Sequence, residues 1–370
     1  MNPFLFRLFR GAETSFHELN YLFWECTTRC NLSCRHCGSD CGVQSRQKDM
    51  PLEDFLRVLD TIPSKDRPKN FTVVLTGGEP TLRPDLVRCG EEITRRGFAW
   101  GMVSNGYFYS EDKQAQLLRA GMRTLTISLD GLEASHDWMR GREGSFARAS
   151  EAIRLAASVK GLAFDVVTCV NKRNLTELPN IHNLLESWGV PGWRLFTIIP
   201  IGRAANDPDM VLSDDEFKQM MEFIKSCREG RCPVGAIEDA DKTVGPLNKA
   251  GGESSRMKTT FSCEGYLGKY ENVVRDTPFF CHAGINIASV LIDGRICACP
   301  NIDRDAFAQG SIYCDNFYEV WQNRFEPFRK RDPGGICGGC EKWRDCLGGG
   351  MHNIKGDSLA PLECLYRKTL

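Results

Sequence analysis

Cysteine is the residue whose number and spacing first suggest chemistry in this chain. Its 370 residues include 18 cysteines, with five between Cys26 and Cys41 and nine between Cys263 and Cys364. In a reducing compartment, cysteines in such numbers are more often metal ligands than disulfide partners. The chain therefore has two regions that could hold metal, separated by a long stretch with only four cysteines.

The first of these regions has the spacing Cys30-x3-Cys34-x2-Cys37. Thiolates at such short spacings hold iron–sulfur clusters. Three thiolates leave one iron of a [4Fe–4S] cluster without a protein ligand, and that open iron can bind a substrate. The alternative is a zinc site, because zinc takes four ligands and His36 or Cys41 could be the fourth. The spacing alone leaves both interpretations open.

Alternating hydrophobic patterns from residue 21 to residue 230 predict the elements around this loop. Six apolar runs have the length and the β-branched or aromatic content of strands, at 21–27, 71–76, 99–104, 124–129, 163–170 and 193–200. Amphipathic helices are predicted at 51–62, 84–96, 110–120, 145–160, 175–188 and 213–229. Six strand–helix units predict an α/β fold with parallel strands. We therefore expect a partial (β/α)6 TIM-like barrel, with an open doubly wound sheet as the alternative.

In both folds, chemistry lies at the carboxyl ends of the strands. The cysteine loop follows the first predicted strand. The motifs after later strands are Gly77-Gly78-Glu79-Pro80, Ser104-Asn105-Gly106, Ser128-Leu129-Asp130-Gly131 and Pro200-Ile201-Gly202-Arg203. Each motif alone is usually no more than a turn. Their succession at strand ends after the cysteine loop favours an iron–sulfur site over a zinc site.

This succession of motifs resembles the radical S-adenosylmethionine (SAM) superfamily, whose signature is Cys-x3-Cys-x-aromatic-Cys. His36 occupies the aromatic position, and its imidazole can also pack against adenine. The resemblance implies that SAM binds the open iron of the first cluster. The other residues implied in SAM binding are Gly77, Gly78, Glu79, Pro80, Ser104, Asn105, Ser128, Asp130, Arg140 and Arg203. Of these, the glycine-rich motif would contact the amino group and the Asp130 motif the ribose, while Arg140 could pair with the carboxylate.

The second cysteine-rich region, residues 231–370, does not continue the strand–helix rhythm. Its spacings are Cys281-x12-Gly294-x4-Cys299 and Cys337-x2-Cys340-x5-Cys346, followed by Cys364. This pattern resembles the SPASM domain, which carries auxiliary [4Fe–4S] clusters in peptide-modifying radical SAM enzymes. The alternative is a pair of zinc ribbons, which the short cysteine spacing would also suit.

The resemblance also assigns ligands to one or two auxiliary clusters. The expected ligands of the outer cluster are Cys337, Cys340, Cys346 and Cys364. The family pattern places a further cysteine at Gly350, so the inner cluster could be complete by rearrangement, open at one iron, or absent. Its candidates are Cys281 and Cys299, with Cys263 and Cys297 the nearest to complete the set and His352 a weaker substitute. Other cysteines are expected to pack as small apolar residues, namely Cys89, Cys169, Cys227 and Cys314.

The resemblance implies a radical SAM oxidoreductase or peptide maturase. Such an enzyme reductively cleaves SAM to a 5′-deoxyadenosyl radical, which abstracts hydrogen from a ribosomally made peptide or protein. A flavodoxin or ferredoxin would supply the electron. Two alternatives remain open: a radical SAM enzyme that acts on a small molecule or cofactor precursor, and a non-catalytic zinc-binding or electron-transfer module.

The composition is that of an ordinary globular protein, with 42% hydrophobic residues, 26% charged residues and a net charge of −1. Nothing in this balance indicates nucleic-acid binding, and no stretch reaches the roughly 20 apolar residues of a membrane span. We therefore expect a cytoplasmic protein. Residues 1–20 are expected to form an amphipathic extension that packs on the body, residues 21–230 the radical SAM barrel and residues 231–370 the SPASM-type domain.

Overall fold

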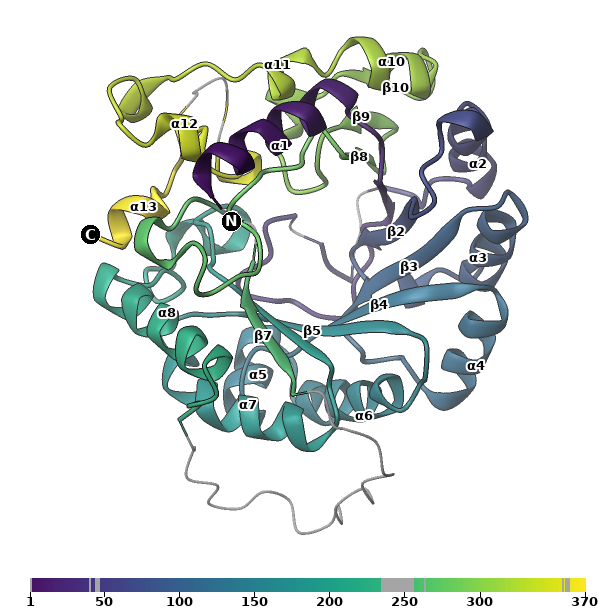
Figure 1. Cartoon of the computed structure of the whole chain (residues 1–370). Helices are drawn as coiled ribbons and strands as arrows, with labels where there is room; N and C mark the ends of the chain where they lie inside the picture. The colour runs from purple at the N-terminus through teal and green to yellow at the C-terminus, as the bar shows by residue number, and fades with distance from the viewer. Residues whose placement is uncertain are drawn as a thin grey trace.

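The computed structural model describes residues 2–39, 41–43, 47–233, 256–262, 264–354, 356 and 360–370. Within these residues, ten strands form one sheet in the order β10-β9-β8-β1-β2-β3-β4-β5-β6-β7. The sheet curves around a central space with helices on its outer side, so the molecule is a partial barrel (Figure 1). The N-terminal helix and the C-terminal segments lie together across the remaining side.

The six predicted strands and the six predicted helices are all present, with slightly shifted ends. The strands are β1 (Tyr21–Thr27), β2 (Thr72–Gly77), β3 (Ala99–Ser104), β4 (Met122–Ser128), β5 (Ala163–Cys169) and β6 (Gly192–Phe196). The helices are α2 (Leu52–Asp60), α3 (Leu86–Arg95), α4 (Glu111–Arg119), α6 (Ser145–Ala157), α7 (Leu178–Ser187) and α8 (Asp214–Arg228). Neighbouring strands from β1 to β6 are parallel and follow chain order. This order confirms the partial barrel, because a doubly wound sheet reverses its strand order at a switch point.

The sheet continues past residue 230 at both of its edges. β7 (Lys258–Phe261) pairs in parallel with β6, and β8 (Ile287–Val290) pairs in parallel with β1. β9 (Arg295–Cys297) and β10 (Gly310–Ser311) then extend the β8 edge in antiparallel fashion. Strands this short carry too few residues for their periodicity to be recognised. The cysteine-rich region is thus joined to the barrel by backbone hydrogen bonds.

Large aromatic side chains fill the layer between the sheet and its outer helices. Trp24, Trp100 and Trp193 are each 0% exposed. Trp24 stacks on Phe55 of α2 with ring centroids 4.2 Å apart. Burial of such side chains is the main favourable term in folding. The packed core therefore lies between the sheet and its outer helices, and the polar residues at the carboxyl ends of the strands lie outside it.

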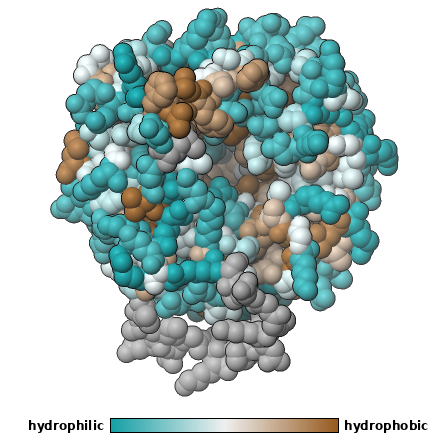
Figure 2. Space-filling view, viewed as in Figure 1, coloured by the Kyte–Doolittle hydropathy of each residue, from teal (hydrophilic) through white to brown (hydrophobic). Residues whose placement is uncertain are grey.

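The N-terminal segment forms α1 (Pro3–Phe16), which packs on the body as predicted. Phe6 is buried against Phe280 and Ile285, and Arg10 donates to the carbonyl of Asp345 at 2.9 Å. The apolar side chains that α1 exposes are Phe4, Leu5, Leu8, Phe9 and Phe16, and Figure 2 shows apolar surface in this part of the molecule. No helix in the described part of the chain combines the length and apolar character that crossing a bilayer requires.

Candidate active site and auxiliary metal sites

The loop after β1 brings Cys30, Cys34 and Cys37 together at the carboxyl end of the barrel strands. Their side chains share one small cluster with Leu32 and Cys41. Cys30 and Cys34 are each 8% exposed, and burial raises the pKa of both thiols, to about 11 for Cys30. A metal cation displaces the proton of such a thiol when it binds. Cys30 and Cys34 therefore suit metal ligation better than chemistry as free thiolates. Cys37 differs, because its hydrogen bond with Cys41 lowers its pKa to about 6.

Gly202 and Arg203, which follow β6, hold this loop in place. Arg203 donates through Nε to the carbonyl of Cys34 (2.7 Å) and through Nη1 to the carbonyl of Cys41 (3.0 Å). Gly202 has a φ of +56°, and a Cβ there would lie 2.4 Å from the carbonyl oxygen of Cys37. These contacts give Arg203 a role in shaping the cysteine loop. Its contact with SAM stays a prediction.

Gly77 and Gly78, at the end of β2, pack against the backbone that leads into the cysteine loop. A Cβ on Gly77 would lie 2.1 Å from the carbonyl oxygen of Thr27, and one on Gly78 would lie 2.1 Å from that of Arg29. The N–H groups of Gly78 and Glu79 donate to the same two carbonyls, at 2.7 and 2.8 Å. The close approach of two chain segments therefore explains glycine at both positions even without a ligand.

Replacing Gly77 with alanine is expected to destabilise the fold by more than about 2 kcal/mol, since strained backbone costs about 1–3 kcal/mol and the methyl group would also overlap the Thr27 carbonyl. Gly77 has a φ of +117°. Urea unfolding followed by circular dichroism measures the loss. Gly97→Ala is the matched control, because its φ is +79° but no heavy atom lies within 4 Å of an added Cβ. Equal losses would show that backbone conformation alone requires glycine at position 77.

Glu79 connects the end of β2 to the end of β3. Its buried carboxylate accepts hydrogen bonds from Ser104 Oγ (2.8 Å) and from the backbone N–H of Asn105 (2.7 Å). Burial raises the pKa of Glu79 in spite of these bonds. Asn105 directs its Nδ2 at Cys30 Sγ, 3.9 Å away. Pro80, the next residue after Glu79, is buried at the start of a short 3-10 turn. Glu79 thus fixes the two polar residues of the β3 end relative to the cysteine loop.

Asp130, just after β4, is the centre of a buried polar group. Its carboxylate pairs with Arg140 Nη2 at 2.6 Å, lies 3.8 Å from His36 Nε2 and accepts the backbone N–H of Cys169 at 2.8 Å. Asp130 and Arg140 are 1% and 6% exposed. Arg140 also directs Nη1 at Cys34 Sγ, 3.7 Å away. The structure therefore brings three predicted SAM-binding residues together beside the second cysteine of the loop.

Burial and neighbouring charges have opposite effects on the pKa of Asp130. Burial by itself would raise the pKa of Asp130, but Arg140 and His36 lower it below its ordinary value. Burial lowers the pKa of His36 to about 4, so its ring is neutral near pH 7.

Arg140 is the last residue of α5 (Glu133–Arg140), a helix that the sequence pattern does not predict. Ser128 is the partly buried last residue of β4.

Three buried nitrogen atoms near the cysteine loop have no hydrogen-bond partner among the described residues. They are His36 Nδ1, Arg140 Nε and Asn31 Nδ2. Buried polar atoms are nearly always paired in folded proteins. Unpaired polar atoms beside three thiols fit a ligand that carries a carboxylate, an amino group and ribose hydroxyls. The residues present therefore fit a [4Fe–4S] cluster with bound SAM.

The four candidate ligands of the outer cluster face one space. Cys337, Cys340, Cys346 and Cys364 all line a cavity of about 110 Å³ in the C-terminal region. Cys346 ends α12 (Trp343–Cys346), and Cys364 directly precedes α13 (Leu365–Lys368). Four thiols around one cavity are the ligand set of a complete [4Fe–4S] cluster.

The inner candidates Cys281 and Cys299 are both partly buried. Burial, with a smaller contribution from nearby Cys281, raises the pKa of Cys299 to about 12. The N–H of Met351 points at Cys281 Sγ, 3.4 Å away. A Cβ on Gly350 would lie 2.5 Å from Cε1 of His352. The imidazole thus occupies the space that a side chain at position 350 would take.

The other cysteines have different surroundings. Cys297 lies on β9, is 0% exposed and packs in the main hydrophobic core, whereas Cys263 lies outside the described residues. Cys89 is buried in the same core, which confirms the prediction that it packs as a small apolar residue. That prediction is wrong for Cys314, which is exposed in the turn after β10.

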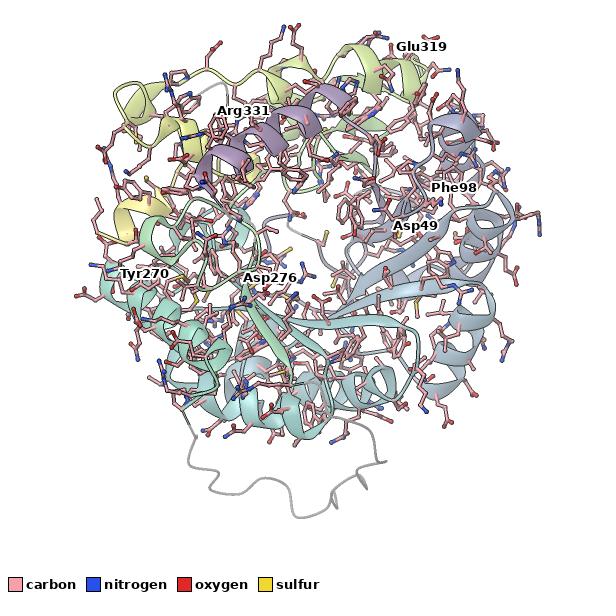
Figure 3. The ribbon with its side chains drawn as sticks, in the orientation of Figure 1. Asp49, Phe98, Tyr270, Asp276, Glu319 and Arg331 are labelled. Atoms are coloured by element: carbon pink, nitrogen blue, oxygen red, sulfur yellow. A yellow bond between two sulfur atoms is a disulfide. The ribbon has the colours of Figure 1, made fainter. Side chains whose placement is uncertain are left out.

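The tertiary structure adds two charged residues that sequence patterns miss, the buried Glu264 and the partly buried Arg331. Glu264 is 4% exposed and accepts hydrogen bonds from Thr197, just after β6, through its N–H (3.0 Å) and Oγ1 (2.6 Å). Burial raises the pKa of Glu264 to about 7. Arg331, labelled near α1 in Figure 3, donates to the carbonyl of Gly349 at 2.9 Å. The one sequence signal for Glu264 is its position directly after Cys263.

Comparisons with known proteins agree with this geometry. Residues 24–185, which contain the cysteine loop and Asp130, match the family model described as the radical SAM superfamily. The AdoMet-dependent heme synthase of Nitratidesulfovibrio vulgaris is 27% identical over 370 residues, covering 97% of this chain and 95% of the relative. The mycofactocin maturase MftC of Mycobacterium tuberculosis is 28% identical over 337 residues, covering 89% of this chain and 78% of the relative.

Two solved structures share the whole fold. Streptococcus suis SuiB bound to S-adenosylmethionine superimposes with a TM-score of 0.68 at 14% identity, over 96% of this chain and 80% of SuiB. The protein anSMEcpe with bound AdoMet and a Cp18Cys peptide superimposes with a TM-score of 0.65 at 16% identity, over 95% of this chain and 94% of the other. At these identities, the likeness concerns the TIM-like partial barrel and its cysteine-rich C-terminal region.

The cofactors follow from the family and the geometry together. The cofactors are a [4Fe–4S] cluster that binds SAM and auxiliary iron–sulfur clusters of the SPASM type. The clustered thiols of the matched region and the C-terminal cysteines remain the predicted ligands. The chain is therefore an enzyme, which excludes a non-catalytic zinc-binding or electron-transfer module. By the match of residues 24–185 and by its cysteine loop, this chain carries a radical SAM domain.

Proposed function

We propose that this enzyme cleaves SAM reductively and modifies a ribosomally made peptide or protein by hydrogen-atom abstraction. The observation that carries this proposal is the gathering of Cys30, Cys34 and Cys37 beside the Asp130–Arg140 pair. When bound, a [4Fe–4S] cluster and SAM supply one-electron cleavage of the sulfonium to a 5′-deoxyadenosyl radical. A flavodoxin or ferredoxin is the proposed electron donor.

The chain's own residues hold and orient these groups. The three thiolates of the loop would hold the cluster, and with three protein ligands it would keep one iron for SAM. Arg140 is fixed by Asp130 at 2.6 Å, and its unpaired Nε is free to donate to the SAM carboxylate. The neutral ring of His36 offers a flat face for adenine. Because these side chains are buried, water is kept away from the reacting atoms.

Relatives of two kinds support a peptide substrate. The curated relatives include the mycofactocin maturase MftC, and SuiB bound to its precursor peptide SuiA superimposes on this chain with a TM-score of 0.69 at 14% identity. The surface is also hollowed at the centre of Figure 2, where the interior of the barrel lies in Figure 1. A chain segment could enter the barrel there.

A small-molecule substrate is the second candidate. Relatives named AdoMet-dependent heme synthase, from Nitratidesulfovibrio vulgaris, Oleidesulfovibrio alaskensis and Methanosarcina barkeri, match 92% to 97% of this chain at 26% to 27% identity. Their coverage of the chain is greater than that of the maturases. An iron porphyrin that precedes heme is therefore the alternative substrate.

A comparison of the two substrate classes in separate reactions tests the proposal. The enzyme is reconstituted anaerobically with iron and sulfide, reduced with dithionite and supplied with SAM. It is then offered either short peptides encoded beside its gene or an iron porphyrin with carboxylate side chains. We expect a peptide to change mass in proportion to the 5′-deoxyadenosine formed, as measured by mass spectrometry. Conversion of the porphyrin and not of any peptide would favour the second candidate, and SAM cleavage with neither would refute both.

A further inference from the structure

A further group of side chains of the metal-ligand type lies between α7 and the end of α8, outside the active site and the auxiliary cluster sites. His182, Cys227 and Cys232 each place a ligand atom within 4.8 Å of the other two. His182 and Cys227 are 2% and 3% exposed. The structure confirms that Cys227 packs in the hydrophobic core, and it also joins Cys227 to Cys232 in a disulfide.

The end of α8 holds this group firmly against the barrel. Arg228 donates to Asp276, labelled in Figure 3, at 2.6 Å and to the carbonyl of Thr259 on β7 at 3.2 Å. Gly230, with a φ of +87°, then turns the chain so that Cys232 returns beside the helix end. The two sulfurs therefore sit on an anchored turn, which favours a defined ligand geometry.

His182 contributes an unsatisfied donor or acceptor to the group. Its Nδ1 is buried and has no hydrogen-bond partner among the described residues. The neighbouring rings are those of Trp193 and Phe223, whose centroids lie 6.1 Å and 6.5 Å from that of His182. The indole N–H of Trp193 donates its hydrogen bond to Thr168 Oγ1 and not to His182. Buried polar atoms are nearly always paired. One ring nitrogen of His182 lies within 4.8 Å of both sulfurs, so a cation bound by the sulfurs could also bind this imidazole.

We propose that His182, Cys227 and Cys232, with the cysteines reduced, bind one zinc ion. Two thiolates and an imidazole are ligands that zinc prefers. Around a tetrahedral zinc ion such donors are about 3.5–4 Å apart, which is compatible with a group whose ligand atoms all lie within 4.8 Å. Three protein donors leave the fourth position for water. Trp193 marks the start of β6, so this site lies at the opposite end of that strand from the cysteine loop.

The disulfide and the zinc site are two states of the same pair of cysteines. A thiol reductant supplies two electrons and two protons, which convert the sulfur–sulfur bond into two thiols. Zinc then replaces the two thiol protons, which pass to water.

Metal analysis of the full chain tests this inference. The protein is reconstituted anaerobically with iron and sulfide, reduced with dithiothreitol, incubated with zinc chloride and briefly chelated to remove loosely bound metal. We expect about one zinc ion per chain in the wild type, measured by plasma mass spectrometry. The double variant Cys227→Ser/Cys232→Ser should lose the zinc but keep its iron and its SAM cleavage. Cys314→Ser, which changes an exposed cysteine, is the control and should keep both metals.

His182→Asn separates metal binding from disulfide formation, because it leaves both sulfurs in place. It should weaken zinc affinity by at least about tenfold. X-ray absorption of the wild type should show two sulfurs at about 2.3 Å and one nitrogen at about 2.0–2.1 Å from zinc. Equal zinc in the wild type and the double variant at matched iron would overturn the proposal. So would a Cys227–Cys232 disulfide that survives reduction of the native protein. If the double variant does not fold, His182→Asn and the absorption spectrum decide the question.

Discussion

Cys34→Ala is expected to lower the formation of 5′-deoxyadenosine to less than about 1% of the wild-type rate, because two thiolates cannot hold a [4Fe–4S] cluster with one open iron. Cys34 lies at the centre of the loop, buried beside Arg140, whose Nη1 is 3.7 Å from its sulfur. The substitution also leaves that guanidinium next to a methyl group. The rate is measured by chromatography and mass spectrometry after anaerobic reconstitution with SAM and dithionite.

Iron analysis shows whether this loss has the proposed cause. Cys34→Ala should lose about four irons per chain, the content of one cluster, while iron at the auxiliary sites remains. Cys89→Ala is the matched control, since Cys89 is also buried but lies in the core between sheet and helices. It should keep both iron and turnover. Normal turnover by Cys34→Ala would refute the assignment of this thiolate.

Asp130→Ala is expected to destabilise the protein by about 3–5 kcal/mol, the usual effect of removing one partner from a buried ion pair. Arg140 would remain 6% exposed without the carboxylate that now lies 2.6 Å away. The substitution also removes the acceptor of the Cys169 N–H. Urea unfolding at pH 7 measures the loss. Asp165→Ala is the control, because Asp165 pairs with Arg194 at a partly exposed position, where an ion pair contributes about 0–1 kcal/mol.

The pH dependence of this loss identifies its electrostatic part. The pKa of Asp130 lies below its ordinary value in the folded state. A carboxyl group of this kind contributes stability that is fully present above its unfolded pKa of about 3.9 and is lost as the pH falls through the folded-state pKa. The wild type and Asp130→Ala should therefore differ most near neutral pH and less in acid. A difference that does not change with pH would mean that lost packing, and not charge, explains the effect.

Local sequence patterns are sufficient to predict the barrel strands and most of the outer helices. A run such as Phe71–Thr76 is continuous and apolar because helices cover one face of its strand and the barrel interior the other. Helix ends are also locally encoded. Ser213 and Glu216 form a reciprocal capping box at the start of α8. Short-range patterns of this kind are read from a few neighbouring residues, so no knowledge of the fold is needed.

Elements that depend on distant partners could not be recognised in the same way. α5 has only eight residues, and its buried face includes the polar residues His136 and Arg140, so a search for apolar periodicity does not find it. β7 and β8 have four residues each and become strands by pairing with β6 and β1. Their hydrogen bonds are made with chain segments far away in sequence, which propensity and periodicity do not register.

The sequence by itself determined the three-cysteine loop, the parallel strands that carry it and the resemblance to one enzyme superfamily. These features are encoded by spacings of a few residues. The tertiary structure alone decided which side chains meet, as Arg140 with Asp130 and His182 with Cys227 and Cys232. It also showed that Gly77 is required by a neighbouring carbonyl. Such contacts arise when the whole chain packs, because burial forces polar groups that are distant in sequence to find partners close in space.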